Sequence, residues 1–201
     1  MINPLTDALR AEYQNLFDTC QIRPQAQVEV DALATKIIAN RGRYEAVGTP
    51  LSIPWYFIGV IHNMESSQRF DRHLHNGDPL TARTVQVPAG RPAGGNPPFT
   101  WEASATDALK LEGLDKVTEW NFPALLYRIE KYNGFGYRNR HPEVLSPYLW
   151  SGSNHYTKGK FVADGKFDPD APSKQCGAAV LLRRMADRNV LPPTGAAAPI
   201  T

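Results

Sequence analysis

Glu65 is the residue whose type and position most clearly suggest chemistry. It follows the apolar run WYFIGVIHNM, and counting back by four and then three gives Ile61 and Ile58, so its side chain projects from an apolar helical stripe. Apolar neighbours and the partial negative charge at a helix C-terminus both disfavour ionisation of a carboxyl group. We therefore expect Glu65 to keep its proton near neutral pH, as a general acid must.

Two other interpretations of this stretch are possible in principle. Glu65 could form an ion pair with Arg69, one turn further on, and only close the helix. Ser66 offers a hydroxyl group, but the sequence has no G-x-S-x-G elbow and no ordered His and Asp partners for a serine nucleophile. Serine nucleophile chemistry is therefore not predicted.

The elements that must position Glu65 are mostly helical. Apolar residues spaced by three and four predict amphipathic helices, and Ser52 and Pro54 suit the start of the helix that carries Glu65. Asn121 can cap a later helix and Gly134 can end it. The expected helices are 5–20, 26–40, the helix from Ser52, 102–111, 121–133, and one that starts at Ser173 and runs past Met185.

Residues 71–100 interrupt the helical pattern. We expect the turn Asn-Gly-Asp, then a short strand in TARTVQV, and then an irregular run in PAGRPAGGNPPF. Long loops of this kind are often functional in compact domains. A small hairpin is predicted around Asp164 and Gly165, and the tail, residues 192–201, is predicted to be disordered.

Composition and charge exclude several classes of protein. The 201 residues carry 22 basic and 20 acidic side chains, a balance that does not favour nucleic-acid binding. No apolar run is long enough for membrane insertion, and the first residues do not resemble a signal peptide, so we expect synthesis in the cytoplasm. Cys20 and Cys176 form no C-x-x-C pair and are interpreted as reduced core residues.

A metal site is weighed and not predicted. His73 and His75 form an H-x-H pair that could face one way from a strand, but zinc needs at least a third ligand with fixed geometry. No cofactor is predicted either.

Two elements carry a resemblance to a known family. The stretch IGVIHNMESSQRF resembles the catalytic helix of the lysozyme-like superfamily, especially goose-type lysozymes and lytic transglycosylases, and RIEKYNGFGYR resembles their Tyr-Asn-x-Gly element. The whole chain also resembles a group of bacterial and phage lysozyme family proteins. The well-known part of the resemblance covers roughly residues 54–137 and implies cleavage of peptidoglycan between its amino sugars.

The resemblance assigns roles residue by residue. Glu65 matches the general acid, and Tyr132 with Asn133 matches the element that lines the sugar cleft. Goose-type enzymes carry an aspartate near the position of Asp78, which therefore becomes the expected second carboxylate, with Asp71 as the reserve. That carboxylate would activate water or stabilise positive charge on the sugar ring.

Further substrate contacts are expected around this core. Thr81 and Thr84 could hold the attacking water, or could simply form a strand, and Gln86 stands where the family carries a Gly/Met/Gln run that is otherwise absent here. Aromatic residues could stack on sugars or fill a core, and Trp150 and Asn154, in a Ser- and Asn-rich stretch, are the candidates for sugar contact. The other aromatic residues weighed are Trp101, Trp120, Tyr148 and Tyr156.

The sequence thus predicts a mainly α (α+β), lysozyme-like fold with a small β-hairpin element lining a sugar-binding cleft. One catalytic domain is expected over 1–191, with N-terminal helices in 1–45, a catalytic core in 52–137 and a C-terminal part in 138–191.

The expected function is a monomeric muramidase that binds peptidoglycan glycan strands and acts on the cell wall after release or export. A lytic transglycosylase needs no second carboxylate, so Asp78 discriminates it from a hydrolase. A chitinase or chitosanase could use the same chemistry, and a non-catalytic wall-binding protein could keep the cleft alone.

Overall fold

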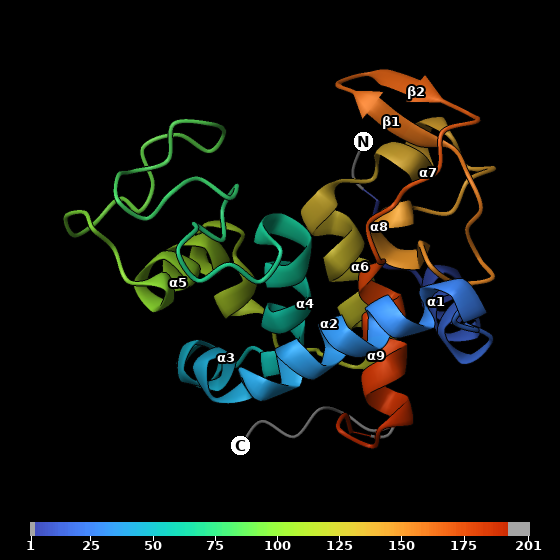
Figure 1. Cartoon of the computed structure of the whole chain (residues 1–201), viewed down its shortest axis with the longest axis horizontal. Coiled ribbons are helices and arrows are strands. Elements are labelled where there is room, and N and C mark those ends of the chain that lie inside the picture. Colours follow the sequence, from blue (N-terminus) through green and yellow to red (C-terminus); the bar gives the residue numbers. More distant parts are fainter. Residues whose placement is uncertain (1–2, 193–201) are drawn as a thin grey trace. The chain divides into compact units, whose positions relative to one another are not determined.

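The computed structural model describes residues 3–192 and is mainly helical, with one small antiparallel sheet (Figure 1). The predicted tail, residues 192–201, lies outside the described residues except for its first position. In the described chain the α-helices are α1 (Asp7–Asp18), α2 (Gln27–Ala39), α3 (Arg41–Gly48), α4 (Trp55–Ser66), α5 (Trp101–Leu111), α6 (Phe122–Asn133), α7 (Gly136–Arg140), α8 (Pro147–Trp150) and α9 (Ala178–Asp187). The sheet pairs β1 (Lys160–Ala163) with β2 (Lys166–Asp168).

Contacts divide the chain into two compact units. Unit 1 joins the chain up to Thr35 with the chain from Asn121 onward, and unit 2 is Lys36–Trp120. Each unit is described by itself. Among the described helices, none combines the length and apolarity needed to cross a membrane.

Unit 2 is built on the burial of α4. Phe57, Ile58 and Ile61 are completely buried, and α3 packs against both α4 and α5. Gly59 makes a close approach possible, because a Cβ atom there would lie 2.6 Å from Cγ2 of Ile37. Burying side chains of this size stabilises the fold by about 2 kcal/mol each.

Unit 1 packs α1 on α6 around a buried polar group. The Tyr13 hydroxyl donates a hydrogen bond to Glu130, which is only 3% exposed, and Arg138 donates to the same carboxylate at 3.0 Å. Phe17 and Phe122 pack beside this group with ring centroids 4.7 Å apart. The positive charge of Arg138 offsets the cost of burying the Glu130 carboxylate.

Several sequence predictions are confirmed. Helices α1, α5 and α6 lie within two residues of their predicted bounds, and the Asn121 side chain caps α6 by accepting from the Ala124 N–H. The hairpin around Gly165 is present. Both Cys20 and Cys176 are buried and free.

Other predictions about elements are wrong. Ser52 does not cap α4: it adopts a left-handed backbone at the end of a 3-10 helix, and Pro54 takes the cap position. Helix α9 starts at Ala178 and not at Ser173, because the backbone of Gly177, its N-cap residue, is extended (φ -71°, ψ 147°). Gly177 also passes so close to Leu149 that a Cβ atom would lie 2.3 Å from its carbonyl oxygen. The expected strand in TARTVQV does not form.

A buried histidine links α4 to the chain around it. His62 is completely buried, Nδ1 lies 3.0 Å from the Tyr44 hydroxyl, and Nε2 lies 3.2 Å from the Arg69 carbonyl. The rings of Phe70 and Trp101 lie against it, each with its centroid 4.6 Å away. Burial lowers the pKa of His62 to about 4, so the neutral ring donates to the carbonyl and accepts from the tyrosine.

This histidine makes stability depend on pH. Because its pKa is lower in the folded state than its ordinary value, about 6.5, its stabilising contribution is complete above that value and is lost as pH falls toward 4. We expect the free energy of unfolding to fall by up to about 3 kcal/mol over this interval. Urea unfolding at several pH values would measure it. In His62→Gln the slope over this interval should be smaller, and equal slopes in the two proteins would contradict the assignment.

Candidate functional site

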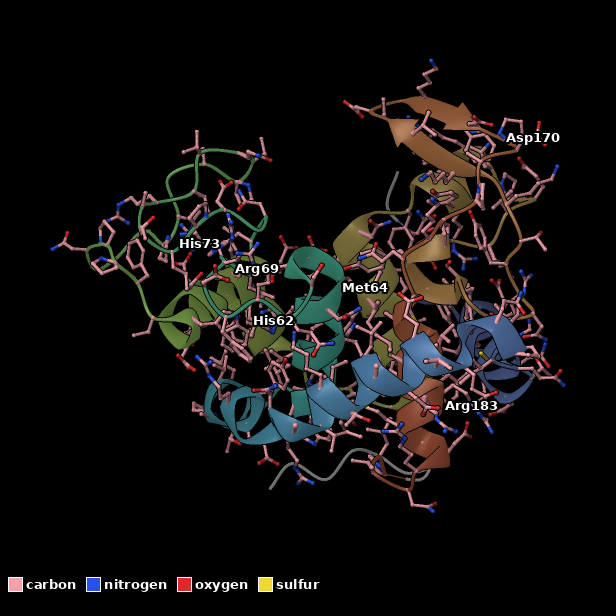
Figure 2. The ribbon with its side chains drawn as sticks, viewed as in Figure 1. His62, Met64, Arg69, His73, Asp170 and Arg183 are labelled. Carbon is pink, nitrogen blue, oxygen red and sulfur yellow. The ribbon has the colours of Figure 1, made fainter. Side chains whose placement is uncertain are left out.

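Glu65 is the partly exposed end of an otherwise buried helix. The other eleven residues of α4 are buried, whereas Glu65 is half-exposed. Its neighbours Met64 and Ser66 are each 8% exposed. Figure 2 labels Met64 on α4 together with Arg69 and His73 in the irregular chain that follows. The carboxyl group therefore stands where apolar packing meets solvent.

The end of α4 is held in one conformation. Ser67 and Gln68 both have positive φ values, and their N–H groups donate to the carbonyls of Asn63 and His62. The Gln68 side chain is buried and donates to Oδ1 of Asn63 at 2.9 Å. These bonds close the last turn and fix the direction in which Glu65 projects.

The guanidinium of Arg69 binds Asp71. Nε and Nη2 donate to the two carboxylate oxygens at 3.2 and 2.7 Å. This pair holds the pKa of the exposed Asp71 carboxyl below its usual range. The alternative interpretation expected Arg69 to pair with Glu65. Arg69 pairs instead with Asp71, the residue predicted as the reserve carboxylate.

The turn that contains Asp78 lies against the end of α4. A Cβ atom on Gly77 would lie 3.2 Å from the carbonyl oxygen of Glu65, and Gly77 has φ = 77°. The Gly77 N–H donates to the carbonyl of His73 at 3.0 Å and the His73 N–H donates to Asp78 O at 2.7 Å. The backbone of Glu65, the predicted acid, therefore lies close to the turn that carries Asp78, the predicted second carboxylate.

Asp78 organises the loop that follows it. Its Oδ2 accepts from the N–H groups of Val85 at 2.8 Å and Gln86 at 3.1 Å, and from Nδ2 of Asn76 at 3.1 Å. The backbone N–H groups hold the pKa of the Asp78 carboxyl below its usual range, so it stays ionised. They also explain the missing strand, because the amides that a sheet ladder would need are bound to this side chain.

Thr84 and Gln86 have different surroundings. Thr84 is 3% exposed, and its hydroxyl accepts from the Arg91 N–H and donates to the Pro88 carbonyl. This hydroxyl is used within the loop, so a role in holding water is unsupported. The Gln86 side chain is exposed, and its backbone carbonyl accepts from Asn76 at 3.0 Å.

The rest of the 71–100 segment is attached to α5. Nδ1 of His73 lies 2.7 Å from the Ser104 hydroxyl, and Nε2 of His75 lies 2.8 Å from Oδ2 of Asp107. Arg91 binds the same Asp107 through Nε and Nη2. The two histidines therefore fasten the loop, and in the described residues no group of three His, Cys, Asp or Glu side chains is arranged to hold a metal ion.

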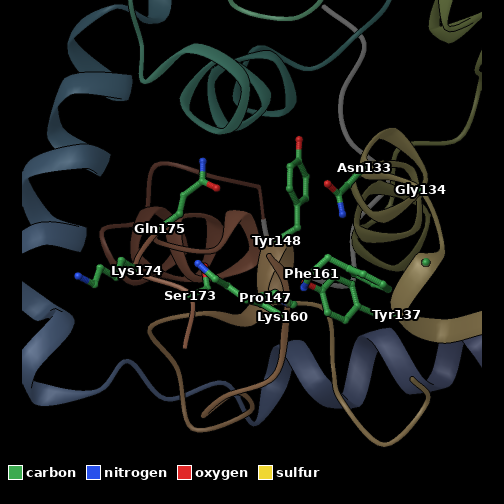
Figure 3. Close-up of a pocket in the computed structure, with 11 residues that line it drawn as sticks. Asn133, Gly134, Tyr137, Pro147, Tyr148, Lys160, Phe161, Ser173, Lys174 and Gln175 are labelled. Atoms are coloured by element: carbon green, nitrogen blue, oxygen red, sulfur yellow. The ribbon is translucent and has the colours of Figure 1, made fainter. Parts of the chain in front are cut away.

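The predicted sugar-binding residues Tyr132 and Asn133 end α6 in unit 1. Tyr132 is half-buried and Asn133 is exposed. Asn133 lines a cavity of about 540 Å³ together with Tyr137, Tyr148 and Lys160 (Figure 3). Tyr148 is one of the aromatic residues that the sequence offers for sugar contact, whereas no sequence pattern points to Lys160.

Two other predicted contacts have structural surroundings. Trp150 is only 1% exposed, so its ring has no face open to a sugar, and it packs edge-on against His155 at 5.2 Å. The exposed Asn154 accepts from the Gln21 N–H at 2.9 Å and donates to the Thr19 carbonyl at 3.1 Å. Both residues stabilise unit 1, which is a sufficient reason for their presence.

Comparison with known proteins adds no relative: no family, curated protein or solved structure matches this chain. The assignments therefore depend on the residues and their surroundings. Glu65 and Asp78 belong to unit 2, whereas Tyr132 and Asn133 belong to unit 1.

The role of Asp78 in the loop can be tested by substitution. Asp78→Asn keeps an acceptor oxygen but loses its charge, so we expect a loss of about 1 kcal/mol and roughly fivefold faster amide exchange at Val85 and Gln86. The difference from wild type should disappear as pH falls through the lowered pKa of Asp78, where the native carboxylate is neutralised.

Asp71→Asn is the matched control, because this carboxylate is exposed and pairs only with arginine side chains at the surface. Hydrogen exchange followed by NMR would measure both variants. Equal protection of the two amides in Asp78→Asn and wild type would show that the carboxylate does not organise the loop.

Proposed function

We propose that this protein is a muramidase that cleaves peptidoglycan with Glu65 as the proton donor. The position of Glu65 supports this most: it is the one partly exposed residue of a helix otherwise removed from water. A proton donor needs this combination, because apolar surroundings favour the protonated carboxyl while the substrate must still reach it. The resemblance of residues 54–137 to the lysozyme-like superfamily supports the same role.

In the proposed reaction, Glu65 gives its proton to the glycosidic oxygen as the bond to the anomeric carbon breaks. Positive charge develops on the sugar ring and is stabilised by a carboxylate, and water then adds to the anomeric carbon and gives its proton to the Glu65 carboxylate. Asp78 suits this electrostatic role, because backbone N–H groups keep it ionised and its turn lies beside the end of α4. The substrate is the glycan strand of the cell wall, reached after release or export.

A lytic transglycosylase is the second candidate, and the hydrogen bonds of Asp78 favour it. Three N–H groups donate to Oδ2 of this carboxylate. A carboxylate with its charge so satisfied is a weak base and activates water poorly. Glu65 would then act without a second carboxylate, and a hydroxyl group of the sugar itself would attack.

A digest of purified sacculi tests the proposal. We expect wild type to release soluble muropeptides and Glu65→Gln to release at least a hundredfold less, since general acid catalysis contributes about 10²–10⁴ in rate. Mass spectrometry of the products identifies the reaction: reducing ends indicate hydrolysis, and anhydro ends indicate transglycosylation. If the enzyme hydrolyses the glycan strand, Asp78→Asn should abolish release. If it is a transglycosylase, Asp78→Asn should still release muropeptides.

The exposed Glu112, at the end of α5, provides the matched control. Glu112→Gln makes the same chemical change at the end of a different helix, so it should digest sacculi like wild type. Wild type that binds sacculi without releasing muropeptides would contradict the proposal and identify a wall-binding protein. Undiminished release by Glu65→Gln would exclude Glu65 as the acid.

A further inference from the structure

Unit 1 contains a cavity with the properties of a ligand site. The cavity beside Asn133, called here the Tyr148 pocket, has a volume of about 540 Å³, within the range of small-molecule sites. The residues that give it its chemistry are Asn133, Tyr137, Tyr148, Lys160, Lys174 and Gln175. Figure 3 shows Lys174 and Gln175 on one side of Tyr148 and Asn133 on the other.

The charged side chains that line the Tyr148 pocket are all positive. Lys160 and Lys174 line it, and the lining contains no Asp or Glu. Within residues 3–192, neither ammonium group lies within ion-pair distance of a carboxylate, whereas the nearby Lys158 pairs with Asp170 at 2.5 Å. Two lysines without an internal counter-charge in a cavity favour an anionic ligand.

The walls of the pocket favour a ring-shaped ligand. The Tyr137 hydroxyl accepts from the Phe161 N–H at 3.1 Å, and the two rings pack edge to face with centroids 5.0 Å apart. This contact fixes one aromatic wall, and Tyr148 supplies a second ring. The amide group of Asn133 adds a donor and an acceptor that orient polar substituents.

We propose that the Tyr148 pocket binds an amino sugar that carries a peptide, with Lys160 and Lys174 binding the peptide carboxylate. This inference rests on the proposed function and specifies its substrate class. An unsubstituted chain of N-acetylglucosamine is neutral and offers the lysines no partner. A muramic acid residue with its stem peptide provides both a ring and a carboxylate, so the pocket selects peptidoglycan over chitin.

NMR titration of the whole chain with small probes tests this. The probes are N-acetylmuramyl-L-alanyl-D-isoglutamine, the same compound with its free carboxylate amidated, and N-acetylglucosamine. Binding is read from the amide shifts of Gly134 and Gly136, which line the pocket. We expect the acidic probe to bind at least tenfold more tightly than either neutral probe.

Substitution identifies the residues responsible. Lys160→Gln with Lys174→Gln should weaken binding of the acidic probe about tenfold and leave the neutral probes unchanged. Lys158→Gln is the matched control, because this lysine is already paired with Asp170, and it should bind like wild type. Inorganic phosphate and the free dipeptide complete the series. Equal binding of either to the same amides would overturn recognition of the sugar.

These probes have no glycosidic bond, so the outcome does not depend on catalysis. Equal affinity for the acidic and amidated probes, or unchanged affinity in the double lysine variant, would overturn the inference even if sacculi are digested. Lysine-dependent binding of the acidic probe together with an inactive wild type would instead refute the proposed reaction and leave the binding site intact.

Discussion

The burial of α4 is the constraint on which unit 2 depends. Its side chains fill the space against α3, and at Gly59 the helix approaches Ile37 too closely to admit a side chain. A helix so placed can reach solvent only at an end, and that end carries Glu65. The same packing that stabilises the unit therefore creates the environment in which a carboxyl group can retain its proton.

Side-chain hydrogen bonds, and not a β-sheet, hold the irregular 71–100 segment in place. Asp78 binds the amides of the next turn, and Asp107 on α5 holds both His75 and Arg91. A loop anchored in this way can form a fixed wall beside the end of α4 without a sheet. Proteins commonly carry function on such loops, positioned by a rigid scaffold.

Capping residues and apolar periodicity predicted the helices whose ends depend on nearby residues in the sequence. Asn121 and Gly134 bound α6 as expected, and Glu65 lies in the last turn of a buried helix, as the apolar residues before it predict. Long-range packing determined the rest. Trp150 is buried although the residues after it are mostly polar, and the Tyr148 pocket draws its lining from segments far apart in the sequence. Neither periodicity nor composition carries that information.

The proposed reaction requires the carboxyl of Glu65 to retain its proton in this setting. Carbon-13 NMR of the glutamate carboxyl groups across pH, with Glu65→Gln to assign the resonance, measures this directly. We expect Glu65 to be still mostly protonated at pH 6, well above the value of about 4.3 at which free glutamate is half-ionised. Ionisation of Glu65 together with free glutamate would contradict it.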